Sequence, residues 1–195
     1  MHGIFDEKRV ILWRTIYDLN VKGLVLGISG SFREGGNTDY LLLKALEIFK
    51  ERKFNVKLVA LRNYKIGYTK SCRRCLEEGK CIIDDDMTRR IAPLLLRARI
   101  IILASPVYFD NVTALMKTFM DRTWWLRGKL RYKIGEGIVV GRGYGLDTAL
   151  QEIHNFMLKH EMIICHRGVR CRAFEKNEAA KDETALKDIE KWLIH

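Results

Sequence analysis

Residues 100–105, with the sequence IIILAS, are apolar at every position except the last. A strand buried on one face alternates apolar and polar residues, and this run shows no such alternation. A continuous apolar strand is typical of a parallel sheet that helices cover on both faces. The run therefore predicts a strand at the centre of an α/β fold.

Further apolar segments alternate with segments of helical periodicity along the chain. The other strands are predicted at residues 23–29, 55–61, 137–141 and 162–169. One helix is predicted to begin at about residue 37, and a second is predicted to end at about residue 97. Three more are predicted at residues 112–125, 146–159 and 178–194. Asn37 or Thr38 would cap the first helix, and Pro93 would kink the second or mark its first turn. Five strands alternating with helices indicate a three-layer α/β fold with a parallel sheet.

Composition places limits on the class of protein. The 195 residues suffice for one sizeable core. No apolar run approaches the roughly 20 residues that span a bilayer, and residues 1–20 resemble neither a secretory signal nor an anchor. We therefore expect a cytoplasmic protein, with residues 1–21 as an N-terminal extension. The basic residues that give the net charge of +11 are interleaved with acidic ones, and the sequence contains no recognition motif for nucleic acid. Nucleic acid is therefore not expected as a partner.

Glycine and hydroxyl residues gather in the sequence GISGSFREGGNT, residues 27–38, between the first strand and the first helix. A loop at this place presents unpaired backbone N–H groups at the positive end of the helix dipole. The sequence matches neither the P-loop, which needs a lysine, nor the G-x-G-x-x-G dinucleotide motif. It predicts a site for a terminal phosphate monoester, with an ordinary strand-to-helix turn as the alternative.

A second loop follows the central strand in the sequence SPVYFDNVTALMK, residues 105–117. Together with GSFREGGNT, it resembles the flavodoxin-like NADPH-dependent FMN reductases, and more closely their iron–sulfur flavoprotein branch. The resemblance extends from about residue 23 to the fifth strand. It implies a flavodoxin-like three-layer α/β/α sandwich with a five-stranded parallel sheet of order 2-1-3-4-5, and an FMN-binding domain over residues 22–195. Ligands of such sheets bind where the strand order reverses.

The resemblance implies FMN as the cofactor, held by both loops. Its phosphate would lie on Ser29, Ser31, Arg33, Asn37 and Thr38. Its ring system would be lined by Pro106, Val107, Tyr108, Phe109 and Asn111. The sequence GRGYG, residues 141–145, follows the fourth strand and adds Gly143 and Tyr144 as further candidates.

The implied activity is electron transfer from reduced nicotinamide, NADPH or NADH, through FMN to an acceptor. A non-enzymatic FMN electron carrier, with or without an iron–sulfur cluster, is the alternative. The resemblance also implies a homodimer or homotetramer. Basic residues between 122 and 142, with Arg167, Arg170 and Arg172, suggest a docking patch if the two runs share one face. An acidic electron-carrier protein or the phosphates of NADPH would bind there, and a solvated surface is the alternative.

Three of the five cysteines lie close together, at Cys72, Cys75 and Cys81. Clustered thiols in a reducing compartment indicate metal or redox chemistry. The iron–sulfur flavoprotein branch carries four cysteines in this region for a [4Fe–4S] cluster, and Thr69 stands at the first position here. Three hypotheses remain open: a cluster with another fourth ligand, a zinc ion on three thiolates, and free thiols that form a Cys72–Cys75 disulfide on oxidation. Cys165 and Cys171 would be small core residues or a fourth ligand.

Overall fold

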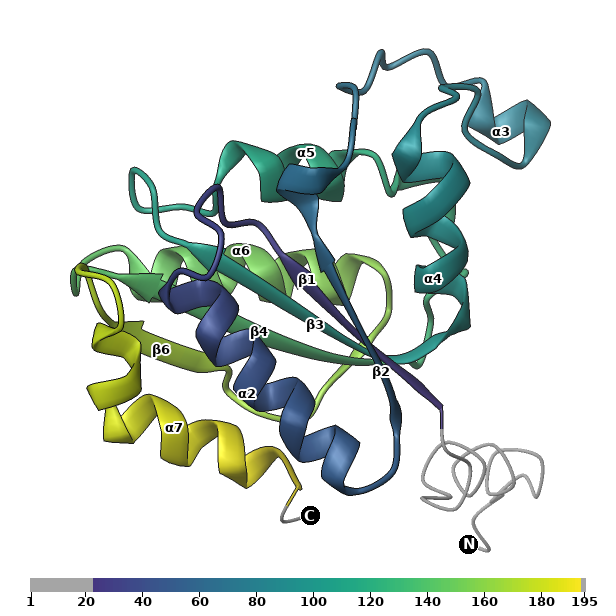
Figure 1. Ribbon diagram of the computed structural model, residues 1–195. Helices are drawn as coiled ribbons and strands as arrows, with labels where there is room; N and C mark the ends of the chain where they lie inside the picture. Colours follow the sequence, from purple (N-terminus) through teal and green to yellow (C-terminus); the bar gives the residue numbers. More distant parts are fainter. Residues whose placement is uncertain (1–22, 194–195) are drawn as a thin grey trace, which may run out of the picture.

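The computed structural model describes residues 23–193, so the expectation for residues 1–21 lies outside the described part of the chain. Within residues 23–193, one six-stranded sheet runs in the order β2-β1-β3-β4-β5, and β6 also pairs with β4 (Figure 1). The strands are β1 (Leu24–Ser29), β2 (Asn55–Ala60), β3 (Ala98–Pro106), β4 (Ile134–Gly141), β5 (Ile163–Ile164) and β6 (Val169–Arg172). Every pairing is parallel. The predicted order 2-1-3-4-5 is confirmed.

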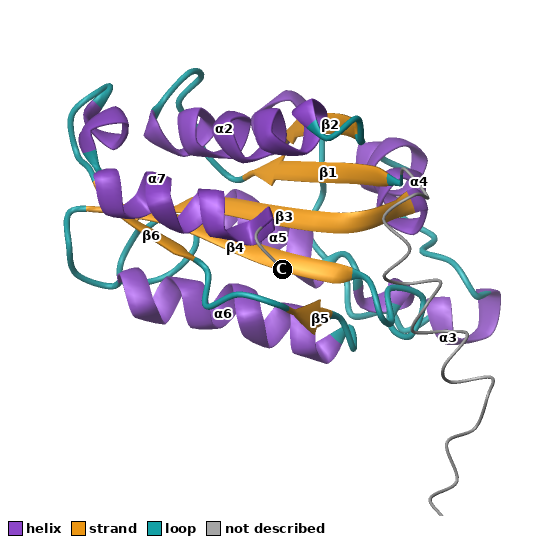
Figure 2. Cartoon of the chain, turned by 90° about the horizontal axis from the view of Figure 1, so that it is seen from below, coloured by secondary structure: helices purple, strands orange, loops and turns teal. Residues whose placement is uncertain are grey.

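Helices cover both faces of the sheet, which confirms the three-layer prediction (Figure 1). One face carries α2 (Asn37–Glu51) and α7 (Glu183–Glu190), and Figure 2 shows α7 beside β6. The other carries α4 (Ala92–Arg97), α5 (Ala114–Asp121) and α6 (Leu146–Lys159). The remaining short helices are Leu61–Asn63, α3 (Cys75–Glu78), Met87–Ile91, Trp124–Leu126, Glu178–Lys181 and Lys191–Leu193. No helix among residues 23–193 is long and apolar enough to cross a bilayer.

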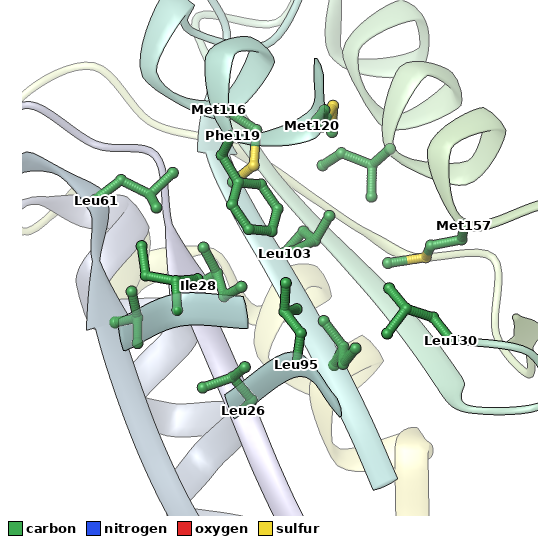
Figure 3. Packing of buried hydrophobic residues seen from close by; sticks show 14 of the residues in the cluster. Leu26, Ile28, Leu61, Leu95, Leu103, Met116, Phe119, Met120, Leu130 and Met157 are labelled. Atoms are coloured by element: carbon green, nitrogen blue, oxygen red, sulfur yellow. The ribbon is translucent and has the colours of Figure 1, made fainter. Parts of the chain in front are cut away.

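The central strand β3 packs against helices on both sides. Ile101 and Leu103 belong to the core beneath α4, α5 and α6, whereas Ile102 belongs to the core beneath α2 and α7. Figure 3 shows Leu103 with Phe119 from α5 and Met157 from α6 in the first of these cores. Burial of each such side chain contributes about 1.5–3 kcal/mol. Burial of β3 on both faces of the sheet explains why apolar and polar residues do not alternate along it.

The predicted fifth strand, residues 162–169, is wrong as a continuous element. It is split into β5, which pairs with β4 at Ile134 and Gly135, and β6, which pairs with β4 from Ile138 onward. Gly168 has φ +79°, a left-handed conformation that favours glycine. A Cβ atom at Gly168 would also lie 2.7 Å from Leu150 Cδ1. The turn at Gly168 breaks the strand, and Glu136 of β4 lies opposite the break.

Several predicted helix limits also differ. Neither Asn37 nor Thr38 caps α2, because both lie inside the helix and Gly36 stands at the cap. The third helix is shorter than residues 112–125, since Thr113 caps α5 by accepting a hydrogen bond from Met116 N–H. The predicted closing helix is divided into the short helices Glu178–Lys181 and Lys191–Leu193 on either side of α7. A π-helical turn, Met87–Ile91, precedes Pro93, whose ring lacks an N–H and crowds the preceding turn.

Candidate functional site

A cavity of about 530 Å³ opens at the carboxyl ends of β1, β3 and β4, where the strand order reverses. We refer to it as the loop cavity, because the segments that follow the strands form its walls. The loop after β1 contributes Ser31, Arg33, Gly36, Asn37 and Thr38, and the loop after β3 contributes Pro106, Val107, Tyr108, Phe109 and Asp110. The loop after β4 contributes Val140, Gly141, Arg142 and Tyr144, and the chain after β6 contributes Ala173 and Phe174.

The N-terminus of α2 forms one end of the loop cavity. Gly36 has no side chain to cap the helix, so the first backbone N–H groups lack a side-chain acceptor. Thr38 is buried and lines the cavity, and its hydroxyl makes no hydrogen bond with the described residues. Arg33 is exposed and pairs with no acid among residues 23–193. An open helix terminus, a buried hydroxyl and a guanidinium together suit a phosphate group.

Ser29 lies beneath the loop and does not line the cavity. Its hydroxyl donates to Asp39 Oδ1 at 2.6 Å, and Asp39 Oδ2 also accepts from Gly35 N–H at 3.0 Å. Arg62 Nη2 lies 3.0 Å from the same carboxylate and balances its charge. The buried Asp39 therefore fixes the shape of the loop, and Ser29 is part of this support.

Asn37 reaches the loop cavity, but its side chain is engaged elsewhere. Its Nδ2 donates to Glu175 O at 2.8 Å, and its Oδ1 accepts from Ala179 N–H at 3.3 Å. These bonds join the start of α2 to the segment that follows β6. Ser31 is also engaged, since its hydroxyl donates to Arg33 O and accepts from Arg33 N–H.

The loop after β3 forms a tight turn closed by two backbone hydrogen bonds between Tyr108 and Asn111, at 2.9 and 3.1 Å. Phe109 and Asp110 at its tip have φ values of +47° and +57°, and the Phe109 side chain is fully exposed. Left-handed conformations at residues other than glycine are strained and collect at ligand sites. Asn111 does not line the cavity, because its Oδ1 accepts from Val112 N–H.

Buried hydroxyl groups join the first two loops. Thr113 Oγ1 donates to Gly30 O at 2.7 Å, and Ser105 Oγ accepts from Thr113 N–H at 3.1 Å. Farther out, the rings of Phe32 and Tyr108 lie parallel with their centroids 6.5 Å apart. The two loops are thus fixed relative to each other.

The glycines of GRGYG allow close approach of other segments. Gly145 has φ +67°, and a Cβ atom there would lie 2.5 Å from Asp110 Cα. Gly143 has φ +123°, and a Cβ atom there would lie 2.5 Å from Arg172 Nε. Tyr144 lines the loop cavity and Gly143 does not. Gly143 therefore makes room for an arginine from β6.

Arg142 and Phe174 line the loop cavity and were not among the predicted FMN-binding residues. The Arg142 guanidinium lies 3.5 Å from the centre of the Phe174 ring. Arg142 lies inside the GRGYG motif, so its position was open to prediction. Phe174 follows β6, whose limits were predicted wrongly, and it belongs to no sequence motif.

A larger cavity of about 880 Å³ lies beside the segment that carries Cys72, Cys75 and Cys81. We refer to residues 67–86 as the cysteine loop. Arg122, at the end of α5, holds its two ends: Nη1 donates to Gly67 O at 2.7 Å and to Asp85 Oδ2 at 2.5 Å. Arg122 Nη2 also lies 3.7 Å from Cys81 Sγ. The guanidinium lowers the pKa of the Asp85 carboxyl against the opposing effect of burial.

The three thiols do not form a metal site in the described part of the chain. No group of three or more cysteine, histidine or acidic side chains among residues 23–193 is arranged to hold an ion. Cys171 is fully buried in the core beneath α2 and α7, on the opposite face of the sheet from α5, and Cys165 is exposed on the chain after β5. A cubane cluster requires four ligands, normally thiolates. The residues present therefore do not fit a [4Fe–4S] cluster.

The basic residues do not form the single face that the sequence suggested. Arg122 is buried beneath the cysteine loop. Arg127 and Lys129 lie over the rings of Trp124 and Trp125, next to the cysteine loop. Ion pairs engage Arg131 with Glu161, Arg167 with Asp188 and Arg170 with Asp147. Arg142 and Arg172 stand apart from these, beside the loop cavity.

Comparison with known proteins identifies relatives over most of the chain. The sequence model of the family described as NADPH-dependent FMN reductase matches residues 24–173. An iron–sulfur flavoprotein of Methanocaldococcus jannaschii is 42% identical over 144 residues, covering 72% of this chain and 74% of that protein. An iron–sulfur flavoprotein of Methanosarcina thermophila is 35% identical over 170 residues, covering 85% and 88%.

Solved structures show the same fold at lower identity. The NAD(P)H:quinone oxidoreductase from Methanothermobacter marburgensis matches with a TM-score of 0.62 and 13% identity, covering 88% of this chain and 97% of that one. A flavodoxin from the domain Archaea matches with a TM-score of 0.56 and 15% identity, covering 86% and 97%. These matches support the flavodoxin-like fold.

Proposed function

This chain belongs to the NADPH-dependent FMN reductase family, and we propose that it passes electrons from reduced nicotinamide through FMN to an acceptor. The observation that carries the proposal is the loop cavity, which combines an uncapped helix N-terminus with aromatic side chains at the carboxyl ends of β1 and β3. A phosphate group at one end and a flat ring system at the other are the two parts of FMN. The residues present fit this cofactor.

In the proposed complex, the first turn of α2, Thr38 and Arg33 bind the phosphate. Val107, Tyr108 and Tyr144 line the ring system. FMN, when bound, accepts a hydride and releases electrons singly or in pairs. The protein orients the cofactor through the loops that Thr113 and Asp39 fix, and aromatic and apolar side chains line the place of the ring. Ser29 acts as a support for the phosphate loop.

The phosphate assignment is tested by comparing FMN with riboflavin, which lacks the phosphate. Arg33→Ala and Thr38→Val are each expected to weaken FMN binding about tenfold, because a hydrogen bond to a charged group contributes about 1.5–3 kcal/mol. Riboflavin binding should change far less. Quenching of flavin fluorescence measures both affinities, and Thr148→Val on the exposed side of α6 is the matched control. An equal loss for FMN and riboflavin would contradict the assignment.

Gly145→Ala is expected to lower FMN affinity by about tenfold or more. The new Cβ atom meets the backbone of Asp110, so the turn that carries Tyr108 and Phe109 must move, and the left-handed backbone adds about 1–2 kcal/mol of strain. Gly128→Ala is the control, because Gly128 has φ +79° and no atom within 4 Å of its Cβ position. The control carries the strain without the contact. Equal FMN affinity in the two variants would show that the contact is unimportant.

The electron-transfer activity is tested by anaerobic mixing of the FMN-loaded protein with NADPH or NADH. Loss of the oxidised-flavin absorbance after mixing, at a rate at least as fast as turnover, identifies an enzyme. Reduction by dithionite alone identifies a non-enzymatic carrier and contradicts the proposed donor. A protein that loads no flavin contradicts the whole proposal.

We also propose an acidic electron-carrier protein as the acceptor, docking beside the cysteine loop. Arg127 and Lys129 support this, since both lie over tryptophan rings next to that loop. Arg127→Glu should slow reduction of the carrier more strongly at low salt than at high salt.

A homodimer or homotetramer is also proposed, from the resemblance to the FMN reductase family.

A further inference from the structure

A carboxylate lies in the helix turn that forms the proposed phosphate site. Asp39 is the third residue of α2, it is 3% exposed, and its neighbour Thr38 lines the loop cavity. Its oxygens contact hydrogen-bond donors: the Ser29 hydroxyl, Gly35 N–H and the Arg62 guanidinium. This surrounding of donors is that of an ionised carboxylate. The helix dipole favours a negative charge in the first turn, but the same charge repels a phosphate that binds there.

Arg62 supplies the opposite charge from another part of the chain. It belongs to the short helix Leu61–Asn63 after β2, and its Nη2 lies 3.0 Å from Asp39 Oδ2. Its Nη1 donates to Asp39 Oδ1 and to Ser31 O, each at 3.3 Å. The side chains of Arg62 and Asp39 are 14% and 4% exposed, so solvent screens the pair weakly. Neither residue lines the loop cavity, so Arg62 influences a bound phosphate through the charge that it cancels rather than by contact.

The charge of the pair decides how the helix terminus receives an anion. With both side chains present, the two charges cancel, and the N–H groups of α2, Thr38 and Arg33 remain to attract the phosphate. Without Arg62, a buried carboxylate would be uncompensated beside a phosphate that carries about −1.5 to −2 charges at pH 7. Without Asp39, the charge of Arg62 would add to the attraction. The two single losses should therefore change phosphate binding in opposite directions.

We propose that the buried Arg62–Asp39 pair determines how strongly the site prefers FMN to riboflavin, with Arg62 as a positioning residue that cancels the charge of Asp39. The inference rests on the proposed function, because the phosphate in question is that of FMN. Riboflavin has the same ring system and no phosphate, so its binding is insensitive to this charge. The ratio of the two affinities thus reports the charge of the pair, whereas damage to the ring site lowers both affinities.

The first test measures the FMN-to-riboflavin affinity ratio by quenching of flavin fluorescence. Arg62→Gln is expected to lower the ratio about tenfold or more, because the uncompensated carboxylate repels the phosphate in a weakly screened environment. Asp39→Asn should keep the ratio or raise it. The double variant Asp39→Asn/Arg62→Gln should return the ratio close to that of the unaltered protein.

The signs of these changes separate charge compensation from a structural role. If the pair only held the loop in shape, each single variant would lower the ratio and the double variant would lower it at least as much. Arg62→Lys keeps the charge but not the two-nitrogen contact, so it should keep most of the ratio. Arg74→Gln is the matched control, because Arg74 pairs with Glu78 on the exposed helix α3.

Far-UV circular dichroism establishes that each variant is folded. Arg62→Gln leaves a buried carboxylate unpaired, which destabilises the fold. Should this variant not fold, Asp39→Asn and the double variant, which contain no such carboxylate, carry the test: a ratio lowered in both would overturn the inference.

Inorganic phosphate provides a second measurement without a flavin. Phosphate should raise the Tm of the unaltered protein and of Asp39→Asn, and it should raise that of Arg62→Gln much less, with chloride at equal ionic strength as the control. A flavin affinity ratio that falls in both single variants, or that Arg62→Gln leaves unchanged, would overturn the inference and leave the proposed function standing. If no flavin binds but the phosphate effect follows this order, the pair stands and the proposed function is overturned. If no flavin binds and phosphate acts equally on all variants, both are overturned.

Discussion

Thr69→Cys is expected to give a protein that keeps a [4Fe–4S] cluster after anaerobic reconstitution, where the unaltered chain loses it. The substitution places thiols at residues 69, 72, 75 and 81, which completes the four-cysteine pattern that the resemblance to the iron–sulfur flavoprotein branch implies. Four thiolates hold a cubane cluster, and three leave one iron open to solvent and oxidation. Cys81 is already anchored by Arg122, so the new ligand acts on a loop with fixed ends.

Iron and acid-labile sulfide, measured after gel filtration, should rise to about four of each per chain in the Thr69→Cys variant. Ser71→Cys is the matched control, because it adds a thiol to the same loop outside the pattern. Zinc is measured in the same samples, since retention of zinc in place of iron would favour the zinc hypothesis. Equal iron in Thr69→Cys and Ser71→Cys would show that the spacing of the four thiols is not what limits cluster binding.

Glu136→Gln is expected to stabilise the protein above neutral pH and to change little at pH 5. Glu136 is 3% exposed, and its Oε2 has no hydrogen-bond partner among the described residues. Burial raises the pKa of this carboxyl from 4.5 to about 8. The folded protein therefore binds more protons than the unfolded chain between these pH values, and the free energy of unfolding falls as the pH rises through them. This contribution is complete below about pH 4.5 and lost above about pH 8.

Each pKa unit corresponds to about 1.4 kcal/mol, so ionisation of Glu136 costs at most roughly 5 kcal/mol at pH 9. Glutamine is neutral at every pH and removes this cost. Urea unfolding at pH 5, 7 and 9 measures the difference, with FMN at the same saturation throughout. Glu190→Gln, at an exposed position on α7, is the control. A constant difference between Glu136→Gln and the unaltered protein across the pH range would refute the burial argument.

The alternation of strands and helices was predictable because each predicted strand is short, apolar and followed by a helical period, whereas the strand order 2-1-3-4-5 was implied by the family resemblance. The break in the fifth strand was not, because it depends on contacts of Gly168 with Leu150, which lies in a helix elsewhere in the sequence. The position of Glu136 opposite that break depends on the same tertiary contact. The limits of β4 and α5 also differ from the predicted ones, for similar reasons. Thr113 is fixed as the cap of α5 by its hydrogen bond to Gly30 O, which lies far away in the sequence, as much as by being a threonine.

The candidate site was partly predictable. Small and hydroxyl residues after a buried strand identified the loop, but the role of each residue depends on where its side chain points. Ser29 points beneath the loop to Asp39, and Asn37 is drawn to Glu175 and Ala179, which lie 138 and 142 residues away. No local pattern contains such partners. The assignment of FMN contacts to single residues therefore stays a prediction.

The attachment of the cysteine loop has a consequence for how such proteins diversify. Lys65 pairs with Asp86 through Lys65 N–H to Asp86 Oδ2 and Asp86 N–H to Lys65 O, and Gly67 N–H donates to Asp85. With Arg122, these bonds close the base of an insertion that projects from the body of the molecule (Figure 1). No residue of the cysteine loop belongs to either buried core, so its sequence and length can change while the walls of the loop cavity keep their packing. A change at residue 69 therefore alters the chemistry of this segment without altering the core.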